Sequence, residues 1–158
     1  KWDLVDKSVT TPRIFEQRLR EMAKYLGHVP MITVSALSGQ RVKKIFPVVN
    51  KIYQQYTTRI GTGQINRIIT NATTRTEPPL HKGRRIKFYY TTQVADRPPT
   101  FVSFVNYPDA VHFSYQRYLI NQIRIQSGLD MVPLRLQFRQ RSGKMIFKKK
   151  KKGRRANF

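Results

Sequence analysis

The sequence predicts an α+β fold, a three-stranded sheet with helices on one face, preceded by a shorter α/β segment. Residues 59–142 show the order helix, strand, strand, helix, strand, and their strands alternate apolar and polar side chains. Residues 1–58 show a helix, a continuous apolar strand and a second helix, which is an α/β pattern. Residues 143–158 are too rich in Lys and Arg to pack and are expected to form a disordered tail.

The positive charge of the chain is concentrated after residue 40. The 158 residues carry 31 Lys and Arg against 8 Asp and Glu, a net charge of +23. Residues 1–40 hold six cations and four anions, whereas residues 41–158 hold twenty-five and four, a net charge of +21. Such a field favours a polyanionic partner, because each neutralised phosphate releases a condensed counterion.

Other functional classes receive no support from the composition. No apolar run approaches the roughly 18 residues of a spanning helix, so we expect a cytoplasmic protein without a membrane partner. The chain has no cysteine, and its three histidines lie far apart, so neither a disulfide nor a metal site is expected.

The first segment is expected to begin with an amphipathic helix. Thr11 is a good N-cap before Pro12, and apolar residues then recur at helical spacing up to a C-terminal cap at Gly27. Residues 30–37 predict a short buried strand, although one strand cannot form a sheet by itself. A second helix follows, whose apolar stripe comprises Val42, Ile45, Phe46, Val49, Ile52, Tyr53 and Tyr56.

A second group of elements follows Arg59. Gly61 is expected to end the preceding helix and Thr62 to cap a new one, which has an apolar face and stops before Pro78. Residues 100–106 predict the second strand of a hairpin, and a third helix is expected to end before Gly128. Aromatic residues assigned to the core are Phe88, Tyr90, Phe101, Tyr115, Tyr118 and Phe138.

The stretch His81–Val94 joins a basic turn to an alternating strand. Its pattern places Ile86, Phe88, Tyr90, Thr92 and Val94 on one face and Lys87, Tyr89, Thr91 and Gln93 on the other. These positions make Lys82, Arg84, Arg85 and Lys87 candidate phosphate contacts. The alternative is a solvated sheet edge, which Lys and Arg often protect from pairing.

Further candidate contacts lie on the third helix and the last strand. Arg117 and Arg124 are seven residues apart and therefore share one helix face, which is either a phosphate track or a solvated surface. Arg135 and Arg139 point outward from the alternating strand that residues 134–139 predict. The rings of Tyr89 and Tyr107 are candidate stacking platforms, although an aromatic residue in a sheet more often packs.

Two short motifs in the first segment resemble guanine-recognition elements. Lys1-Trp2-Asp3 is similar to the last three positions of the N-K-x-D motif of GTP-binding domains, and Ser35-Ala36-Leu37 is similar to their S-A-x motif. The resemblance implies that Asp3 accepts hydrogen bonds from guanine, that the Lys1 stem covers its ring, and that the loop at Ser35 and Ala36 supplies a backbone N–H. The alternative is that Asp3 and Ser35 only stabilise their own turns.

The order of elements after residue 59 resembles a KH-like domain. This order, together with the amino-acid sequences of residues 79–87, 114–119 and 133–138, resembles the C-terminal part of the bacterial Der/EngA family. Members of that family are double GTPases that act in ribosome assembly. The resemblance implies rRNA, or the 50S subunit or its precursor, as partner. It equally allows docking of the KH-like domain on an upstream GTPase domain of the same parent.

Two departures from these patterns limit what the chain can do alone. No G-x-x-x-x-G-K-[ST] loop is present to hold phosphates, so GTP or GDP is expected in the intact parent but not tightly on this chain, which is not expected to be an enzyme by itself. No G-x-x-G loop is present to clamp a nucleic-acid backbone either. Basic side chains are therefore the expected RNA contacts.

Overall fold

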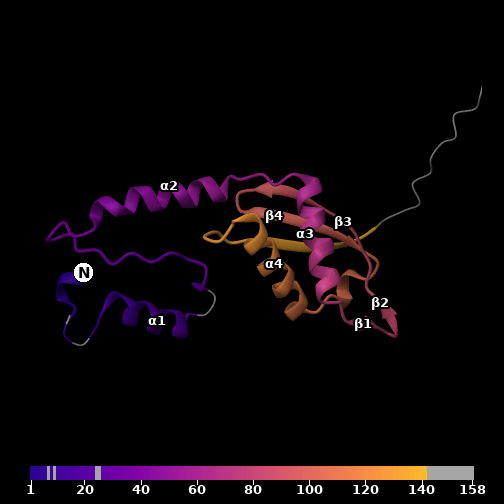
Figure 1. The fold of residues 1–158 in the computed structure, drawn as a ribbon, viewed down its shortest axis with the longest axis horizontal. Helices are drawn as coiled ribbons and strands as arrows, with labels where there is room; N and C mark the ends of the chain where they lie inside the picture. Colours follow the sequence, from indigo (N-terminus) through magenta and orange to yellow (C-terminus); the bar gives the residue numbers. More distant parts are fainter. Residues whose placement is uncertain (7, 9, 24–25, 142–158) are drawn as a thin grey trace, which may run out of the picture.

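The computed structural model describes residues 1–6, 8, 10–23 and 26–141 (Figure 1). The predicted tail, residues 143–158, lies outside this part of the chain. Within it, no helix is long and apolar enough to cross a membrane.

The N-terminal segment holds two α-helices and two short 3-10 helices. Helix α1 spans Pro12–Met22 and α2 spans Ile45–Tyr56, with 3-10 turns at Trp2–Leu4 and Val42–Lys44. Thr11 caps α1 as predicted, because its side-chain oxygen accepts a hydrogen bond from the Ile14 N–H at 3.3 Å. The predicted end at Gly27 is wrong, since the helix stops at Met22.

The strand predicted at residues 30–37 is absent as a strand. The segment forms no ladder. The Trp2 N–H donates to its Val34 carbonyl at 2.9 Å, and its Ser35 N–H donates to the Gln40 carbonyl at 3.2 Å. A strand is defined by its neighbours, and the described residues supply none here. Neither α1 nor α2 buries a residue completely, so this segment does not close a core of its own.

The second part of the chain contains the sheet. Its elements are α3 (Thr62–Arg75), β1 (Leu80–His81), β2 (Arg84–Arg85), β3 (Phe88–Asp96), β4 (Pro99–Val105), a 3-10 turn (Pro108–Ala110), α4 (Phe113–Ser127) and β5 (Arg135–Gln140). Thr62 is the first residue of α3 rather than its cap, and Gly61 occupies the cap position. Gly128 ends α4 as predicted, because its positive φ of 71° suits glycine.

The three-stranded sheet has the order β3-β4-β5, with β3 antiparallel and β5 parallel to the central β4. Helices α3 and α4 lie on the same side of it (Figure 1). Their apolar faces meet the sheet in a core whose buried members include Ile65, Ile69, Phe101, Leu119, Ile123 and Leu136. The predicted α+β fold is confirmed. The faces of β4 and β5 that carry Phe101 and Leu136 turn toward the helices, so the opposite faces of these strands turn away from them.

The predicted faces of the first strand hold from Ile86 to Tyr89 and are wrong from Tyr90 onward. Thr91, expected outside, is fully buried and its hydroxyl hydrogen-bonds Ser103, whereas Tyr90 and Val94 are about half exposed. The ladder between β3 and β4 is irregular between Phe88 and Tyr90 and again after Gln93. Each extra residue reverses the alternation that follows it, so a regular period of two fails across this strand.

The aromatic residues assigned to the core divide accordingly. Phe101 and Tyr115 are buried, and Phe88, Tyr118 and Phe138 are partly buried and pack against the core. Tyr90 does not belong to this group, because its side of β3 faces away from the helices.

Candidate nucleic-acid interface

The basic hairpin, defined here as β1, β2 and their two-residue turn, is held by paired strands and a special backbone geometry. Leu80 pairs with Arg85 and His81 with Arg84, which leaves Lys82 and Gly83 as the turn. Both turn residues have positive φ, 48° and 73°. This is the geometry of a two-residue turn whose twist matches the flanking strands.

All four cations predicted in this region lie at the surface: Lys82, Arg84, Arg85 and Lys87 are exposed. One of the four makes an ion pair, from Arg85 Nη1 to Glu77 Oε1 at 3.1 Å, and it is exposed enough to contribute little to stability. Arg84 Nη1 donates to the Tyr107 hydroxyl at 3.3 Å. The guanidinium of Arg84 is therefore oriented by a neutral partner and keeps its charge available to an anion.

Asn106 attaches the basic hairpin to the sheet, a role that the sequence did not reveal. Its side-chain oxygen accepts from the Lys87 N–H at 2.9 Å, and its amide group donates to the Arg85 carbonyl at 3.1 Å. Its own N–H donates to the Lys87 carbonyl at 3.3 Å. An Asn directly after a strand was the available signal, but its partners 19 and 21 residues earlier were not predictable from local pattern.

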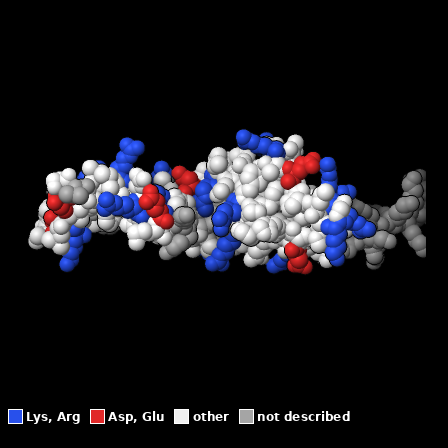
Figure 2. Space-filling view, turned by 90° about the horizontal axis from the view of Figure 1, so that it is seen from below, with Lys and Arg blue, Asp and Glu red and all other residues white. Residues whose placement is uncertain are grey.

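The basic hairpin and the end of β5 share one end of the domain. Strand β3 begins where β4 and β5 end, and the Arg141 N–H donates to the Val105 carbonyl at 3.3 Å. Arg139, which is exposed as predicted, and Arg141 therefore lie at the same sheet end as Lys87. Figure 2 shows Lys and Arg gathered at the end of the described chain next to the grey residues.

The remaining predicted cations lie elsewhere. Arg135 is exposed at the opposite end of β5, and Arg117 is exposed on α4 with its guanidinium 5.8 Å from the Phe113 ring. The eight predicted RNA contacts therefore do not form one continuous group. Those nearest to each other are the four around the basic hairpin together with Arg139.

Arg124 has a contact that the sequence did not suggest. Its Nη1 donates to the carbonyls of Leu129, Asp130 and Val132 at 3.2, 3.3 and 2.9 Å and so holds the loop after α4. Partial burial lowers the pKa of Arg124, an effect that Asp130 opposes. A guanidinium committed to three carbonyls is less available to a phosphate than that of Arg84.

A hollow of about 930 Å³ lies where residues 27 and 28 approach α4. His28 lines it together with Arg117, Asn121 and Arg124. Partial burial, with a smaller contribution from the charge of Arg124, lowers the pKa of His28. An uncharged imidazole is therefore favoured beside the guanidinium.

The two guanine-type motifs come together in space. The Ser35 hydroxyl donates to the Asp3 carboxylate, and the Ser38 N–H donates to the Ser35 hydroxyl oxygen at 3.3 Å. Ser35 is buried, whereas Lys1, Asp3 and Ala36 are exposed. The buried Ser35 hydroxyl therefore holds the orientation of the exposed Asp3 carboxylate, and contact of these residues with guanine stays a prediction.

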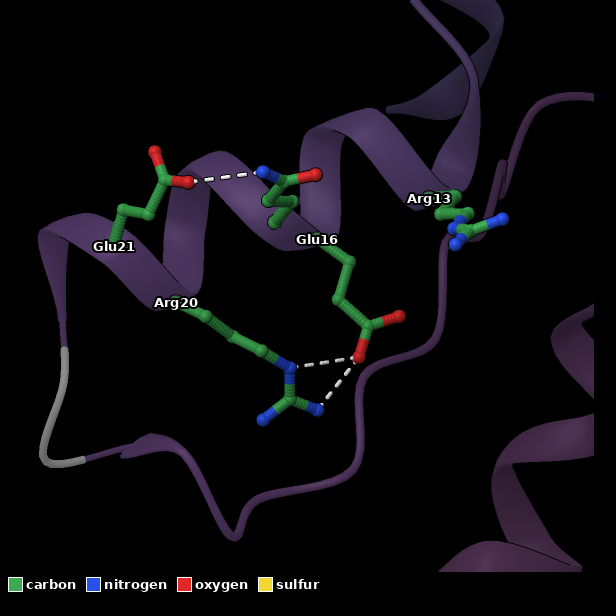
Figure 3. Close-up of a pocket in the computed structure, with 5 residues that line it drawn as sticks. Arg13, Glu16, Arg20 and Glu21 are labelled. Carbon is green, nitrogen blue, oxygen red and sulfur yellow. Dashed lines mark hydrogen bonds and ion pairs between the residues drawn. The ribbon is translucent and has the colours of Figure 1, made fainter.

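An open pocket on α1 is lined by Arg13, Gln17 and Glu21 together with Glu16 and Arg20 (Figure 3). Arg20 reaches Glu16 with an ion pair of 2.6 Å, and Gln17 donates to Glu21 at 3.0 Å. Arg20 also donates to the carbonyls of Gly27 and Val29, so its guanidinium is occupied by contacts within the protein.

The order α3, β3, β4, α4, β5 around one sheet, with both helices on one face, defines the second part of the chain as a KH-like domain. A family profile described as the KH-domain-like C-terminal domain of EngA bacterial GTPase enzymes matches residues 59–139. The chain belongs to this family, as the resemblance in its sequence predicted.

Curated relatives extend the similarity beyond this domain. The chain is 54% identical over 152 residues to GTPase Der of Desulforapulum autotrophicum, a match that covers 96% of the chain and 31% of the relative. It is 46% identical over 142 residues to GTPase Der of Syntrophobacter fumaroxidans, covering 89% of the chain and 32% of the relative. The chain thus spans about a third of the length of these relatives.

Proposed function

We propose that this chain is part of a ribosome-assembly GTPase and that its KH-like domain contacts rRNA of the large subunit through the basic hairpin. GTP-dependent switching belongs to the rest of the parent, because the sequence lacks a phosphate-binding loop. Family membership and the name GTPase carried by the relatives support the first part of the proposal.

The observation that carries the RNA contact is the rigid presentation of exposed cations on the basic hairpin. Paired strands fix its turn, and Asn106 fixes its base to the sheet. A positioned cation loses less side-chain freedom on binding than a mobile one, so more of its attraction to phosphate appears as affinity. The absence of a G-x-x-G loop leaves side chains as the means of gripping a backbone.

In the intact parent, the proposed role of the first segment is recognition of the guanine base of GTP or GDP. Asp3, oriented by Ser35, accepts hydrogen bonds from guanine, and Lys1 and Ala36 complete the contact. Adenine lacks the corresponding pair of donors, so the carboxylate would select between the two bases. Without groups for the phosphates, this chain alone is expected to bind nucleotide only weakly.

The test of the RNA contact is fluorescence anisotropy with fragments of large-subunit rRNA at low salt. Reversing both charges, Arg84→Glu with Arg85→Glu, is expected to weaken binding by at least tenfold and to lower the salt slope. The matched control is Arg18→Glu with Lys51→Glu, which changes the net charge equally at exposed positions of α1 and α2. Equal weakening by both double variants would show that only total charge matters.

A second candidate function is docking of the KH-like domain on an upstream GTPase domain. The hollow between His28 and α4 favours it, because cations from α4 line a surface beside the N-terminal segment. This function predicts that the full-length protein binds rRNA fragments more weakly than this chain does, since the upstream domain would cover the surface. Equal or tighter binding by the full-length protein would argue against it.

A further inference from the structure

The face of the sheet turned away from α3 and α4 carries a stacked pair of aromatic rings. Phe101 and Leu136 lie in the core, so alternation places Phe104 and Arg139 on the opposite face. Phe104 is the register partner of Tyr90 on one side and of Arg139 on the other. The three side chains therefore form a row across all three strands.

The rings of this row are arranged for stacking and are accessible. The centroids of Tyr90 and Phe104 are 4.4 Å apart, with 18° between the ring planes. Tyr90 remains 45% exposed, and the neighbouring Tyr89 is 43% exposed. Tyr89 carries the guanidinium of Arg141 at 5.1 Å from its ring centroid, a cation–π contact. Phe104 thus stacks on the Tyr90 ring, while nearly half of Tyr90 remains open to solvent and to a planar partner.

The charges on this face have one sign. Its register positions that the structure describes are Tyr90, Thr92, Ala95, Thr100, Val102, Phe104, Arg135, Gln137 and Arg139. None of them is Asp or Glu, and two are Arg. A face that combines accessible rings with cations is complementary to a polyanion whose subunits carry planar groups.

We propose that this face is a stacking platform for unpaired RNA bases, in which Tyr90 and Phe104 receive a base and Arg139 and Arg141 contact the adjoining phosphates. The inference rests on the proposed function and narrows it to single-stranded segments. In a duplex, neighbouring bases cover each other and no base face is available to a side chain. The basic hairpin, at the same end of the sheet, continues the phosphate path.

The test compares two probes on the whole chain by fluorescence anisotropy: a 12-nucleotide oligoadenylate RNA, and an abasic ribose-phosphate oligomer of equal length and charge. The chain is expected to bind the oligoadenylate more tightly by roughly 5- to 150-fold, the range that one stacked base provides. Tyr90→Leu is expected to remove most of this preference without changing the salt slope. Tyr53→Leu, at an exposed tyrosine of α2, is the matched control and should change neither quantity.

A second variant separates charge from stacking. Arg139→Gln is expected to weaken both probes by a similar factor and to lower the salt slope, because phosphates are common to both. Thermal unfolding of each variant should match that of the unsubstituted chain, since Tyr90 and Arg139 lie outside the core.

The outcomes distinguish this inference from the function on which it rests. Equal affinity for the two probes, with loss of both in the Arg84→Glu, Arg85→Glu variant, would overturn the stacking platform and leave the RNA contact intact. Failure of the chain to bind either probe or the rRNA fragments would overturn both. If Tyr90→Leu instead weakens association of the chain with the rest of the parent protein and leaves RNA binding unchanged, the face is a protein interface and the inference is wrong.

Discussion

At the scale of single residues, the contacts with most consequence are those that fix charged groups. Asn106 joins the basic hairpin to the sheet through both ends of its amide. The guanidinium of Arg124 donates to three backbone carbonyls and so stabilises the loop after α4. Arg84 and Arg124 thus differ in how available their guanidinium groups are, because their hydrogen-bond partners differ.

Replacing Asn106 tests whether positioning of the basic hairpin matters. Asn106→Ala removes two side-chain hydrogen bonds, so the free energy of unfolding is expected to fall by about 1 to 2 kcal/mol. Affinity for rRNA fragments should fall as well, although no charge is changed. Urea denaturation and anisotropy measure the two effects, with Asn71→Ala on the exposed side of α3 as control. Unchanged affinity would show that the cations act without a fixed position.

The lowered pKa of His28 predicts a pH dependence of stability. The unfolded chain binds a proton at this side chain near the ordinary pKa of 6.5, whereas the folded chain resists it, because burial and Arg124 disfavour the imidazolium. The free energy of unfolding should therefore decrease as the pH falls through and below 6.5, and the loss should be complete below the folded pKa. His28→Gln should remove this part of the dependence. An identical profile in the variant would assign the effect to other groups.

At the scale of elements, turns and bulges decide what the strands present. Gly83 in the basic hairpin has a φ of 73°, and its position has open space around it, so backbone conformation rather than crowding requires glycine. The irregular positions of β3 turn Tyr90 outward, away from the core, and Thr91 inward. The exposure of Tyr90 beside Phe104 therefore results from the irregular pairing of β3 with β4.

A pair of glycine substitutions tests the backbone argument. Gly83→Ala should destabilise the turn by about 1 kcal/mol, because a side chain disfavours positive φ. Gly63→Ala in α3, also with open space around it, should stabilise the chain by about 0.5 kcal/mol. Thermal denaturation measures both, and RNA anisotropy should change only for Gly83→Ala. If both substitutions changed the stability of the chain in the same direction and by the same amount, the turn assignment would be refuted.

At the scale of the whole molecule, the hydrophobic core lies between the sheet and helices α3 and α4. Helix α2 is attached to it through Ile52 and Tyr56, which pack against the core, and through Gln55, which bonds Asp130 and the Met131 N–H. Other members of the same apolar stripe, Phe46, Val49 and Tyr53, remain exposed. The segment before α2 therefore adds little to the core.

Truncation tests this division. A fragment of residues 45–141 should unfold at nearly the same temperature as the whole chain, because it keeps α2 and all core contacts. A fragment of residues 59–141 should still fold cooperatively but at a lower temperature, since it loses the packing of Ile52 and Tyr56. Calorimetry measures both transitions. A large loss already in the longer fragment would show that residues 1–44 stabilise the domain.

The sequence by itself predicted the order helix, strand, strand, helix, strand after residue 59, the apolar faces of α3 and β5 and the capping of α1 by Thr11. It predicted a basic turn before β3, but not the two short paired strands β1 and β2. These features depend on the spacing of apolar residues, 3.6 for a helix and 2 for a strand, and on the residues that favour caps and turns. Both signals come from residues close together in the sequence. The sequence also predicted that Asp3 and Ser35 act together, and the two side chains hydrogen-bond each other. Their contact with guanine stays a prediction.

Only the tertiary structure decided which face of β3 is buried, because two irregular positions depend on pairing with β4. It also decided that residues 30–37 form no strand, since a ladder needs a neighbour that the described chain does not provide. The partners of Asn106 and Arg124, and the meeting of Tyr90, Phe104 and Arg139 in one row, depend on contacts between distant segments. Local pattern cannot supply such contacts, because they arise only when the core fixes the elements against one another.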